Sequence, residues 1–521
     1  MSDSNSSSSS VVIAGGGPVG LTMAALLASQ GIASTVIEAD ESFCTGSRAI
    51  CLARRSLEIL HACGAAQAVK AKGLAWTSGR SYFRGDEVLK FDMPHDDSQR
   101  FAPMTNIQQF YVEEYALRSA ERLFPGLITV RWNTRIAQVE NHSDHAMLTL
   151  DGGEQLRADW LIASDGGRST VREQLGLQLK GVQYEGRYVI VDVKQKSTRL
   201  QTHPVERLAW FDPPTNPGST ILMHRQPDDV WRIDYQVRDD EDPIEAVKPE
   251  NVLPRVKAHL EWMGEIEPWE SQWISIYNAK CLTLDEYRHG RILFAGDAAH
   301  MVPIFGVRGL NSGIDDVGNL AWKLAAVLKG QAGDALLNTY SAERRAAALI
   351  NIDFGSKSTE FMSPPHHGFD LMRQAALRLA GSTPQVRSLI NPRQSAPVRY
   401  SSSRSDGIAD TRMASPGYVA PDARVHIDGK SRYLTEYFWQ GYSLLCFGDL
   451  AACDRVRRIA LNAQTDPHLE ARTRYEAGEH TTVLVRPDGY IAARWDALVS
   501  SADVLQALHN SLHPEEPHAS A

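Results

Sequence analysis

The protein has 521 residues, of which 43% are hydrophobic and 22% are charged, and its formal net charge is −9. This composition is typical of a globular protein with several domains, since one domain usually spans about 150 residues. No block of lysine and arginine stands out that would favour a nucleic-acid partner. No run of about eighteen uninterrupted apolar residues is present that would favour a membrane span.

The N-terminus and the cysteines both favour a cytoplasmic protein. Residues 1–10 are rich in serine and lack the basic segment of a signal peptide, so we predict that they form a disordered N-terminus. The six cysteines have neither CxxC spacing nor the density of a disulfide framework. Because disulfides persist mainly in oxidising compartments, we expect a reducing one here.

The first patterned segment is typical of a nucleotide-binding strand, turn and helix. Residues 11–14 form an apolar strand, Gly15, Gly17 and Gly20 follow in GxGxxG spacing, and an apolar helix and a second strand lead to Glu38. The glycines permit a tight turn and the close approach of a pyrophosphate, and the acid can accept a ribose 2′-hydroxyl. The pattern therefore predicts FAD or NAD rather than NADP. The alternative is a glycine-rich turn without a ligand.

Three further polar residues stand where they could reach a bound nucleotide. Arg48 lies in a loop before a predicted helix, and Gln108 precedes a helix that extends to about residue 123. Asp165 follows a predicted strand over residues 156–163, and glycines, a hydroxyl and an arginine come directly after it. An acid, glycines and a helix start at the end of a strand make a corner that favours anions. Without this context, Arg48 would be interpreted as a surface arginine.

A strand, an acid and a long amphipathic helix form the third patterned segment. Residues 291–295 form an apolar strand that stops at Gly296, which places Asp297 at the carboxyl edge of a sheet. After a loop, a helix with Asn311 as its expected N-cap extends to about residue 330. The carboxylate can hold sugar-like hydroxyls, and the helix N-terminus favours a nearby negative charge, such as that of a reduced flavin. An ordinary strand, loop and helix is the alternative.

In this order, the motifs at 15–20, 165–172 and 296–311 resemble those of the single-component (class A) flavin-dependent aromatic hydroxylases, the family of para-hydroxybenzoate hydroxylase and phenol hydroxylase. The resemblance covers residues 11 to about 361. It implies an α/β fold with a Rossmann-like FAD-binding domain, an inserted antiparallel-sheet substrate domain and a C-terminal thioredoxin-like domain. The FAD-binding positions that it implies are Gly15, Gly17, Pro18, Gly20, Glu38, Arg48, Gln108, Asp165, Asp297, Gly309, Leu310 and Asn311.

The predicted domain organisation follows from these motifs and from composition. In chain order it comprises an FAD-binding domain in two parts (11–180 and 281–390, the second including helices), a substrate-binding sheet domain (181–280), a linker (391–418) and the thioredoxin-like domain (419–521). Cys446 and Cys453, in the last domain, lack CxxC spacing. We therefore expect that domain to serve docking or dimer stabilisation rather than redox chemistry.

The catalytic candidates lie in the predicted substrate sheet. Residues 231–237 alternate apolar and polar side chains, and the usual meaning of such a polar face is contact with solvent. In relatives the corresponding face looks into the pocket, and the resemblance would bring His224 and Asp234 near the substrate. Either side chain could accept a phenolic proton near neutral pH.

This chain departs from the family pattern at two positions. Ile50 stands where phenol hydroxylase has an aspartate that helps to handle the phenol proton, so that base cannot be assigned here. Arg308 lies in a loop where many relatives have Gly-Gly-Gln-Gly. We consider two roles for it: attraction of an anionic substrate or nicotinamide phosphate, or simple exposure to solvent.

The resemblance implies a flavoprotein monooxygenase that acts in aromatic compound catabolism. NAD(P)H, either NADH or NADPH, would reduce FAD, O₂ would add at the flavin C4a carbon, and the hydroperoxide would hydroxylate a phenol or a related electron-rich aromatic ring. No second glycine-rich unit for the nicotinamide is evident, so NAD(P)H would visit a surface groove. We expect no metal and no membrane partner, and a homodimer is possible.

Two other classes of function stay open at this point. One is a flavin-dependent reductase or halogenase on the same scaffold, although the Trp-x-Trp-x-Ile-Pro signature of flavin halogenases is absent. The other is a non-catalytic FAD-binding protein.

Overall fold

The computed structural model describes residues 6–46, 48–196, 203–238, 241–390, 394–400, 412–448 and 453–514. Its first sheet is built from the apolar strands that the sequence predicts. The strand order is β17 (Arg288–His289), β18 (Ile292–Phe294), β11 (Gln155–Ala163), β1 (Ser6–Ala14), β2 (Ser34–Ile37) and β8 (Ile128–Arg131). The neighbours from β18 to β8 are parallel, as in a Rossmann-like fold. The predicted mixed α/β class is confirmed.

The N-terminal strand is longer than the sequence predicted. β1 begins at Ser6, and its serines pair with β11 from Gln155 onwards. The prediction of a disordered segment is therefore wrong for residues 6–10, while residues 1–5 lie outside the described residues. A backbone ladder needs no apolar side chains, and the extended edge of β11 supplies the hydrogen-bonding partners.

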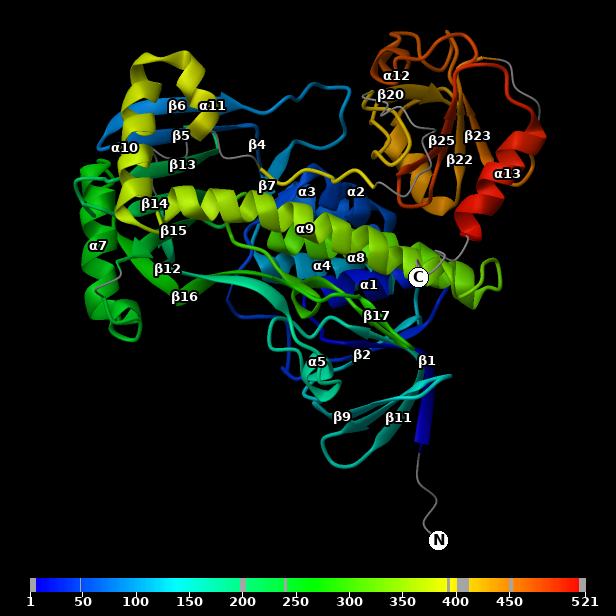
Figure 1. Ribbon diagram of the computed structural model, residues 1–521, viewed down its shortest axis with the longest axis horizontal. Coiled ribbons are helices and arrows are strands. Elements are labelled where there is room, and N and C mark those ends of the chain that lie inside the picture. Colours follow the sequence, from blue (N-terminus) through cyan, green and yellow to red (C-terminus); the bar gives the residue numbers. More distant parts are fainter. Residues whose placement is uncertain are drawn as a thin grey trace.

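Helices cover this sheet and join it to the rest of the molecule (Figure 1). Helix α1 (Pro18–Ser29) packs against α4 (Gln109–Leu123) and α8 (Gly309–Leu328). Helix α9 (Leu336–Met362) packs along α8 and reaches the second sheet. Two antiparallel strands, β9 (Ile136–Asn141) and β10 (Ala146–Leu150), extend the first sheet from β11.

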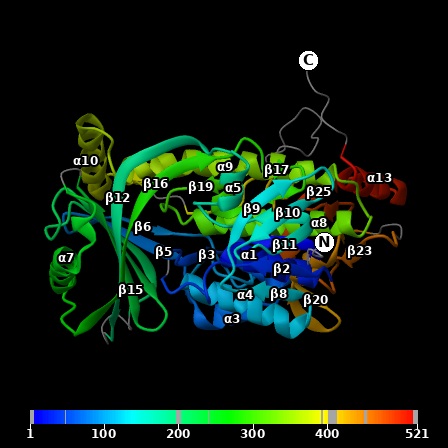
Figure 2. The ribbon, with the colours of Figure 1, turned by 90° about the horizontal axis from the view of Figure 1, so that it is seen from below.

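The second sheet contains the predicted substrate strands and three strands that were not predicted to join it, β19 (His300–Met301), β5 (Ser78–Phe83) and β6 (Asp86–Asp92). Its order is β19, β16 (Trp269–Thr283), β12 (Lys180–Gln195), β15 (Val230–Val237), β14 (Thr220–Gln226), β13 (Glu206–Phe211), β5 and β6. β5 pairs with β13 in parallel, so a hairpin from the first part of the chain completes this sheet. Helix α7 (Pro249–Trp262) covers one face, as Figure 2 shows.

A third unit, orange to red in Figure 1, follows the predicted linker. Its four-stranded sheet has the order β23 (Arg457–Ala460), β22 (Ser443–Cys446), β24 (Thr482–Val485) and β25 (Ile491–Trp495), and α13 (Ser501–Leu512) follows. Apolar residues of this unit pack against Trp322 of α8 and Leu336 of α9. All six cysteines are free thiols.

Among the described helices, none combines the length and the apolar character that crossing a membrane requires.

Candidate flavin site and substrate wall

The glycine turn between β1 and α1 has the conformation that its sequence requires. Gly15 has a φ of +98°, and a Cβ on Gly20 would stand 2.0 Å from the Gly15 carbonyl oxygen. Gly17 is the N-cap of α1 without a side-chain cap, and Pro18 is its first residue. The first N–H groups of a helix have no partner within the helix. This turn therefore presents free backbone donors at the carboxyl end of β1.

Two features of this turn fit a nucleotide. No atom lies within 4 Å of the position that a Cβ on Gly17 would occupy, so the backbone faces open space there. Glu38 directly follows β2, is half-buried, and accepts hydrogen bonds from the backbone N of Gly16 at 2.5 Å and of Asp40 at 2.9 Å. A carboxylate has about four acceptor positions, so it retains capacity for hydroxyl groups.

Asp297 lies at the end of β18, as predicted, in a short 3-10 turn over Gly296–Ala298. It is exposed to solvent. Desolvation by the surrounding protein nevertheless raises its pKa, while the charges of His300, Arg48 and Arg172 act to lower it. Arg48 is itself exposed and close enough to Asp297 to act on its pKa, so the structure brings these two predicted residues together.

Asp165 stabilises the loop between β11 and α5 (Thr170–Gln174). Its carboxylate accepts hydrogen bonds from Ser169 Oγ at 2.5 Å and from the Val171 N at 3.0 Å, at the start of α5. Arg172 of that helix donates to the carbonyl of Ala298 at 3.1 Å. The second and third motifs therefore meet beside Asp297.

The start of α8 differs from the prediction. The helix begins at Gly309, its N-cap is Arg308, and Asn311 is not the N-cap. Asn311 is buried, accepts from the Ala53 N at 2.8 Å and from Ser56 Oγ at 2.6 Å, and donates to two backbone carbonyls. Its side chain fixes α8 to the neighbouring chain. Gly309 and Leu310 are half-exposed residues in the first turn of α8, where N–H groups have no intrahelical acceptor.

Gln108 and Arg308 are buried. Gln108 donates from Nε2 to the carbonyl of Pro227 at 3.1 Å, and its Oε1 has no partner among the described residues. Arg308 donates to Asn351 Oδ1 at 2.9 Å and to the carbonyl of Gln394, and burial lowers its pKa to about 10. The interpretation of Arg308 as a solvated side chain is wrong, because the chain from α9 and residue 394 closes over it.

A buried ionic network, which the sequence analysis missed, holds the turn that carries Asp297. Asp316 of α8 accepts from the Gly296 N at 2.9 Å, from His300 Nε2 at 2.6 Å and from Arg344 Nε at 2.7 Å. Arg344 also donates to the Tyr400 hydroxyl at 2.9 Å, and the Tyr400 ring stacks on Tyr490 of the C-terminal unit. The network thus joins the turn that carries Asp297 to the C-terminal unit.

A second branch of this network reaches the same unit. Glu343 accepts from Lys323 at 2.7 Å and from Arg486 at 2.6 Å, and Arg486 is also paired with Asp488. The only sequence sign of either branch is charged residues inside the apolar patterns of α8 and α9.

The polar face of the second sheet is turned into the protein. His224, Arg232 and Asp234 are all less than a tenth exposed. The interpretation of this face as a solvent-exposed surface is therefore wrong. Arg232 is held by Asp192 through two hydrogen bonds of 2.6 and 2.9 Å, and it donates to the carbonyl of Arg48. The polar face therefore adjoins the loop that approaches Asp297.

Several polar atoms on this face have no hydrogen-bond partner among the described residues. They are His224 Nδ1, Asp234 Oδ1, Arg207 Nη1, Gln236 Oε1 and both amide atoms of Gln226. Buried polar groups in a finished core are nearly always paired. So many orphaned atoms on one face indicate a site that is completed by a ligand.

The two catalytic candidates have different titration behaviour. Burial, together with Arg207 and Arg232, lowers the pKa of His224 to about 3. Burial raises the pKa of Asp234 to about 7, against the lowering effect of Arg232. Asp234 therefore matches the requirement for a base near neutral pH, and His224 does not.

Apolar side chains next to the polar face of the second sheet come from segments that are distant in sequence. Tyr188 contacts Phe305 edge to face at 5.1 Å between ring centroids, and Trp76 lies 6.3 Å from the His224 ring. Ile50, where phenol hydroxylase has an aspartate, is buried.

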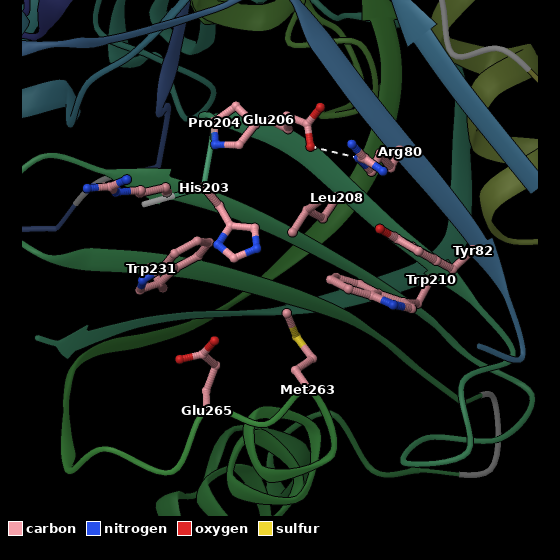
Figure 3. A pocket seen from close by; sticks show the side chains of 11 residues that line it. Arg80, Tyr82, His203, Pro204, Glu206, Leu208, Trp210, Trp231, Met263 and Glu265 are labelled. Atoms are coloured by element: carbon pink, nitrogen blue, oxygen red, sulfur yellow. Dashed lines mark hydrogen bonds and ion pairs between the residues drawn. The ribbon is translucent and has the colours of Figure 1, made fainter. Parts of the chain in front are cut away.

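A cavity of about 380 Å³ lies on the other face of this sheet. Figure 3 shows Trp231, Trp210 and Tyr82 around it, with Met263 and Glu265 opposite. The sheet separates this cavity from the face that carries Asp234, because successive residues of a strand point to opposite sides. It is not the place where a ring would meet the cofactor.

Comparisons with known proteins agree with this geometry. A family model described as FAD binding domain matches residues 8–354. The 3-(3-hydroxy-phenyl)propionate/3-hydroxycinnamic acid hydroxylase of Mycolicibacterium smegmatis is 28% identical over 479 residues, which are 91% of this chain and 81% of that protein. The flavin-dependent monooxygenase PieE, solved with FAD and substrate, has a similar fold with a TM-score of 0.81 at 22% identity, covering 97% of this chain and 99% of that one.

A further solved structure combines similar coverage with higher identity. Aklavinone-11 hydroxylase, in a ternary complex with FAD and aklavinone, has a TM-score of 0.76 at 26% identity, covering 98% of this chain and all of that one.

Proposed function

This chain belongs to the FAD binding domain family and is an FAD-dependent aromatic-ring monooxygenase, and we propose that it hydroxylates a phenol held between the flavin and the polar face of the second sheet. The observation that carries the substrate assignment is the set of unpaired polar atoms on that face, around Asp234. When bound, FAD supplies the redox chemistry that couples NAD(P)H oxidation to transfer of one oxygen atom from O₂ to the ring.

The glycine turn, Glu38, Arg48 and Asp297 are the groups that we assign to FAD. The open space at Gly17 and the free donors of α1 suit the pyrophosphate. Glu38 suits the ribose and Asp297 the ribityl hydroxyls, since both carboxylates have unused acceptor positions. The Gly309 and Leu310 N–H groups would stabilise negative charge on the reduced ring. Asp165 and Asn311 act indirectly, because their side chains are engaged within the protein.

Asp234 is the group that we assign to the phenolic proton. An ionised Asp234 would accept the proton, and the phenolate that results is a more electron-rich ring. Arg232 is hydrogen-bonded twice to Asp192 and lies 4.0 Å from Asp234 Oδ1 in a longer ion pair, and among the described residues no hydrogen bond reaches that oxygen. The apolar side chains of Tyr188, Phe305 and Trp76 would exclude water from the reaction.

The remaining assignments rest on the sequence. We propose the domain boundaries given above, with the substrate sheet extended by β5 and β6, and a cytoplasmic enzyme that takes NADH or NADPH from solution. A homodimer is part of the same proposal. The contacts of the C-terminal unit with α8 and α9 support a stabilising role for that unit.

Gly17→Ala tests the cofactor assignment. The methyl group has room in the protein alone but would occupy the space assigned to the pyrophosphate, so FAD binding should weaken about 10- to 100-fold through lost hydrogen bonds. Fluorescence titration of the apoprotein with FAD measures this. Gly333→Ala is the matched control, because Gly333 also faces open space and has no positive φ. Equal FAD affinity in both variants would reject the assignment.

The reaction itself is tested by measuring NAD(P)H consumption in air with a panel of phenols, with identification of products. The panel contains 3-(3-hydroxyphenyl)propionate, 3-hydroxycinnamate and the neutral polycyclic phenol aklavinone. We expect at least one hydroxylated product in amounts that match the NAD(P)H consumed. NAD(P)H oxidation that yields only peroxide with every phenol would favour a flavin reductase instead.

A further inference from the structure

One buried cation on the substrate face, Arg207, has no hydrogen-bond or ion-pair partner among the described residues. Arg207 lies on β13 and is 5% exposed. Within the described part of the chain its guanidinium makes no hydrogen bond or ion pair, and its Nη1 is fully buried without a partner. Burial alone lowers its pKa to about 10, which keeps it charged at neutral pH. Arg232, on the same face, is by contrast fully paired with Asp192.

An unpaired buried guanidinium is unfavourable for folding. Moving a charge out of water costs several kcal/mol unless an opposite charge and hydrogen bonds compensate. A side chain at this position that served only the fold would be better replaced by an apolar one. The missing partner is therefore a group that arrives from outside and carries negative charge.

The surroundings of Arg207 suit an anion that accepts hydrogen bonds. His224 faces Arg207 across the β13–β14 ladder, and Gln226 follows on the same face with both amide atoms unpaired. On the neighbouring strand β5, Arg207 is paired with Gly79. A Cβ added to Gly79 would clash with the Phe91 ring. No described carboxylate contributes to the pKa of Arg207, so the part of the chain that the structure describes supplies no anion to this site.

The strand register also sets the distance between Arg207 and the residues beside the proposed cofactor site. Arg207, His224 and Arg232 stand in one row across three strands, and Arg232 touches the backbone of Arg48. Two strand spacings amount to roughly 10 Å. A molecule with its ring near Asp234 could therefore place a charged group on a short side chain against Arg207.

We propose that Arg207 binds the carboxylate of the substrate, so that the enzyme acts on phenols that carry a carboxylate on a short side chain rather than on neutral phenols. This inference rests on the proposed function and defines its substrate class. Fork-shaped pairing of guanidinium with carboxylate provides both charge and two parallel hydrogen bonds.

Binding to the FAD-loaded enzyme without NAD(P)H tests this directly. The probes are 3-(3-hydroxyphenyl)propionate and its primary amide, followed by calorimetry. The wild type should bind the acid about 10- to 100-fold more tightly than the amide. Arg207→Met should lose this preference, and Arg207→Lys should retain part of it. Arg80→Met is the control, because Arg80 is on the neighbouring strand β5 but lines the cavity on the other face of the sheet.

A second readout separates ligand binding from a structural role. Without substrate, Arg207→Met should melt at the same temperature as the wild type or higher, since it removes an uncompensated buried charge. A lower melting temperature together with an unchanged acid preference would overturn the proposal. If the acid and the amide bind equally to the wild type while hydroxylation still occurs, Arg207 is not a carboxylate site although the monooxygenase assignment stands. If acid binding depends on Arg207 but no phenol is hydroxylated, the proposed function fails and the anion site remains.

Discussion

Asp316→Asn should lower the free energy of unfolding by about 3–5 kcal/mol and release FAD, because the variant leaves Arg344 buried without its charge partner. The same carboxylate holds the Gly296 N and His300, so the turn that carries Asp297 should lose its fixed position. Denaturant unfolding of the apoprotein measures the first effect, and the flavin content of the purified protein measures the second.

Asp297→Asn is the matched control for this prediction. Asp297 is exposed, and no described residue donates a hydrogen bond to its side chain. Asp316, by contrast, accepts a hydrogen bond from the Gly296 N. The Asp297→Asn variant should therefore lose FAD affinity without losing apoprotein stability. If Asp316→Asn unfolds at the same denaturant concentration as the wild type, the network does not support the site.

The pH dependence of stability provides an independent check on Asp316. Although burial acts to raise its pKa, His300 and Arg344 more than offset this and lower the pKa to about 2. A depressed carboxyl pKa contributes stability above the pKa of the unfolded state, about 3.9, and this contribution is lost as the pH falls towards 2. The wild type should lose stability over this acidic range more steeply than Asp316→Asn does.

Asp234→Asn should lower kcat about 100-fold or more, the usual contribution of a general base. The wild-type kcat should rise as the pH increases through about 7, because Asp234 must be ionised to accept the proton and burial raises its pKa to about 7. The variant should lack this rise. Steady-state rates across pH, with the product quantified, give both results.

A more acidic phenol separates a proton acceptor from a structural residue. A substrate whose ring carries several fluorine atoms has a phenol pKa near or below neutrality, so it is largely ionised without a base. Asp234→Asn should therefore lower its turnover much less than that of the parent substrate. If the fluorinated and parent substrates lose the same factor, Asp234 is not the proton acceptor. His224→Gln should have a smaller effect on kcat, because a side chain with a pKa of about 3 is a weak base.

The flavin motifs could be predicted because each depends on neighbouring residues. The GxGxxG turn, the acid at the end of β2 and Asp297 at the end of β18 are set by strand, turn and helix signals within about 40 residues. The structure places Gly15, Glu38 and Asp297 at the strand ends where the sequence put them.

Features that depend on contacts between distant segments could not be predicted in the same way. The hairpin β5–β6 joins the second sheet through pairing with β13, more than 120 residues later. Alternation in β15 identified a polar face, but periodicity does not show whether solvent or protein covers it. The roles of Asn311 and Gln108 at the cofactor stay predictions, and the hydrogen bonds that their side chains make within the protein could not be predicted from the sequence.

Asp316 and Arg207 could not be assigned from the sequence for a related reason. Their importance depends on whether a partner lies within reach, and only the fold decides this. Asp316 has three donors around it, whereas Arg207 has no described partner at all.

The central claim is that FAD held at Asp297 and the glycine turn supports hydroxylation of a ring placed against Asp234. The most direct test is turnover of the FAD-loaded protein with NAD(P)H and 3-(3-hydroxyphenyl)propionate under isotopically labelled O₂, followed by mass spectrometry of the product. We expect a ring-hydroxylated product that contains one labelled oxygen atom. A protein that remains colourless after incubation with FAD, or a product whose new oxygen comes from water, would contradict the account.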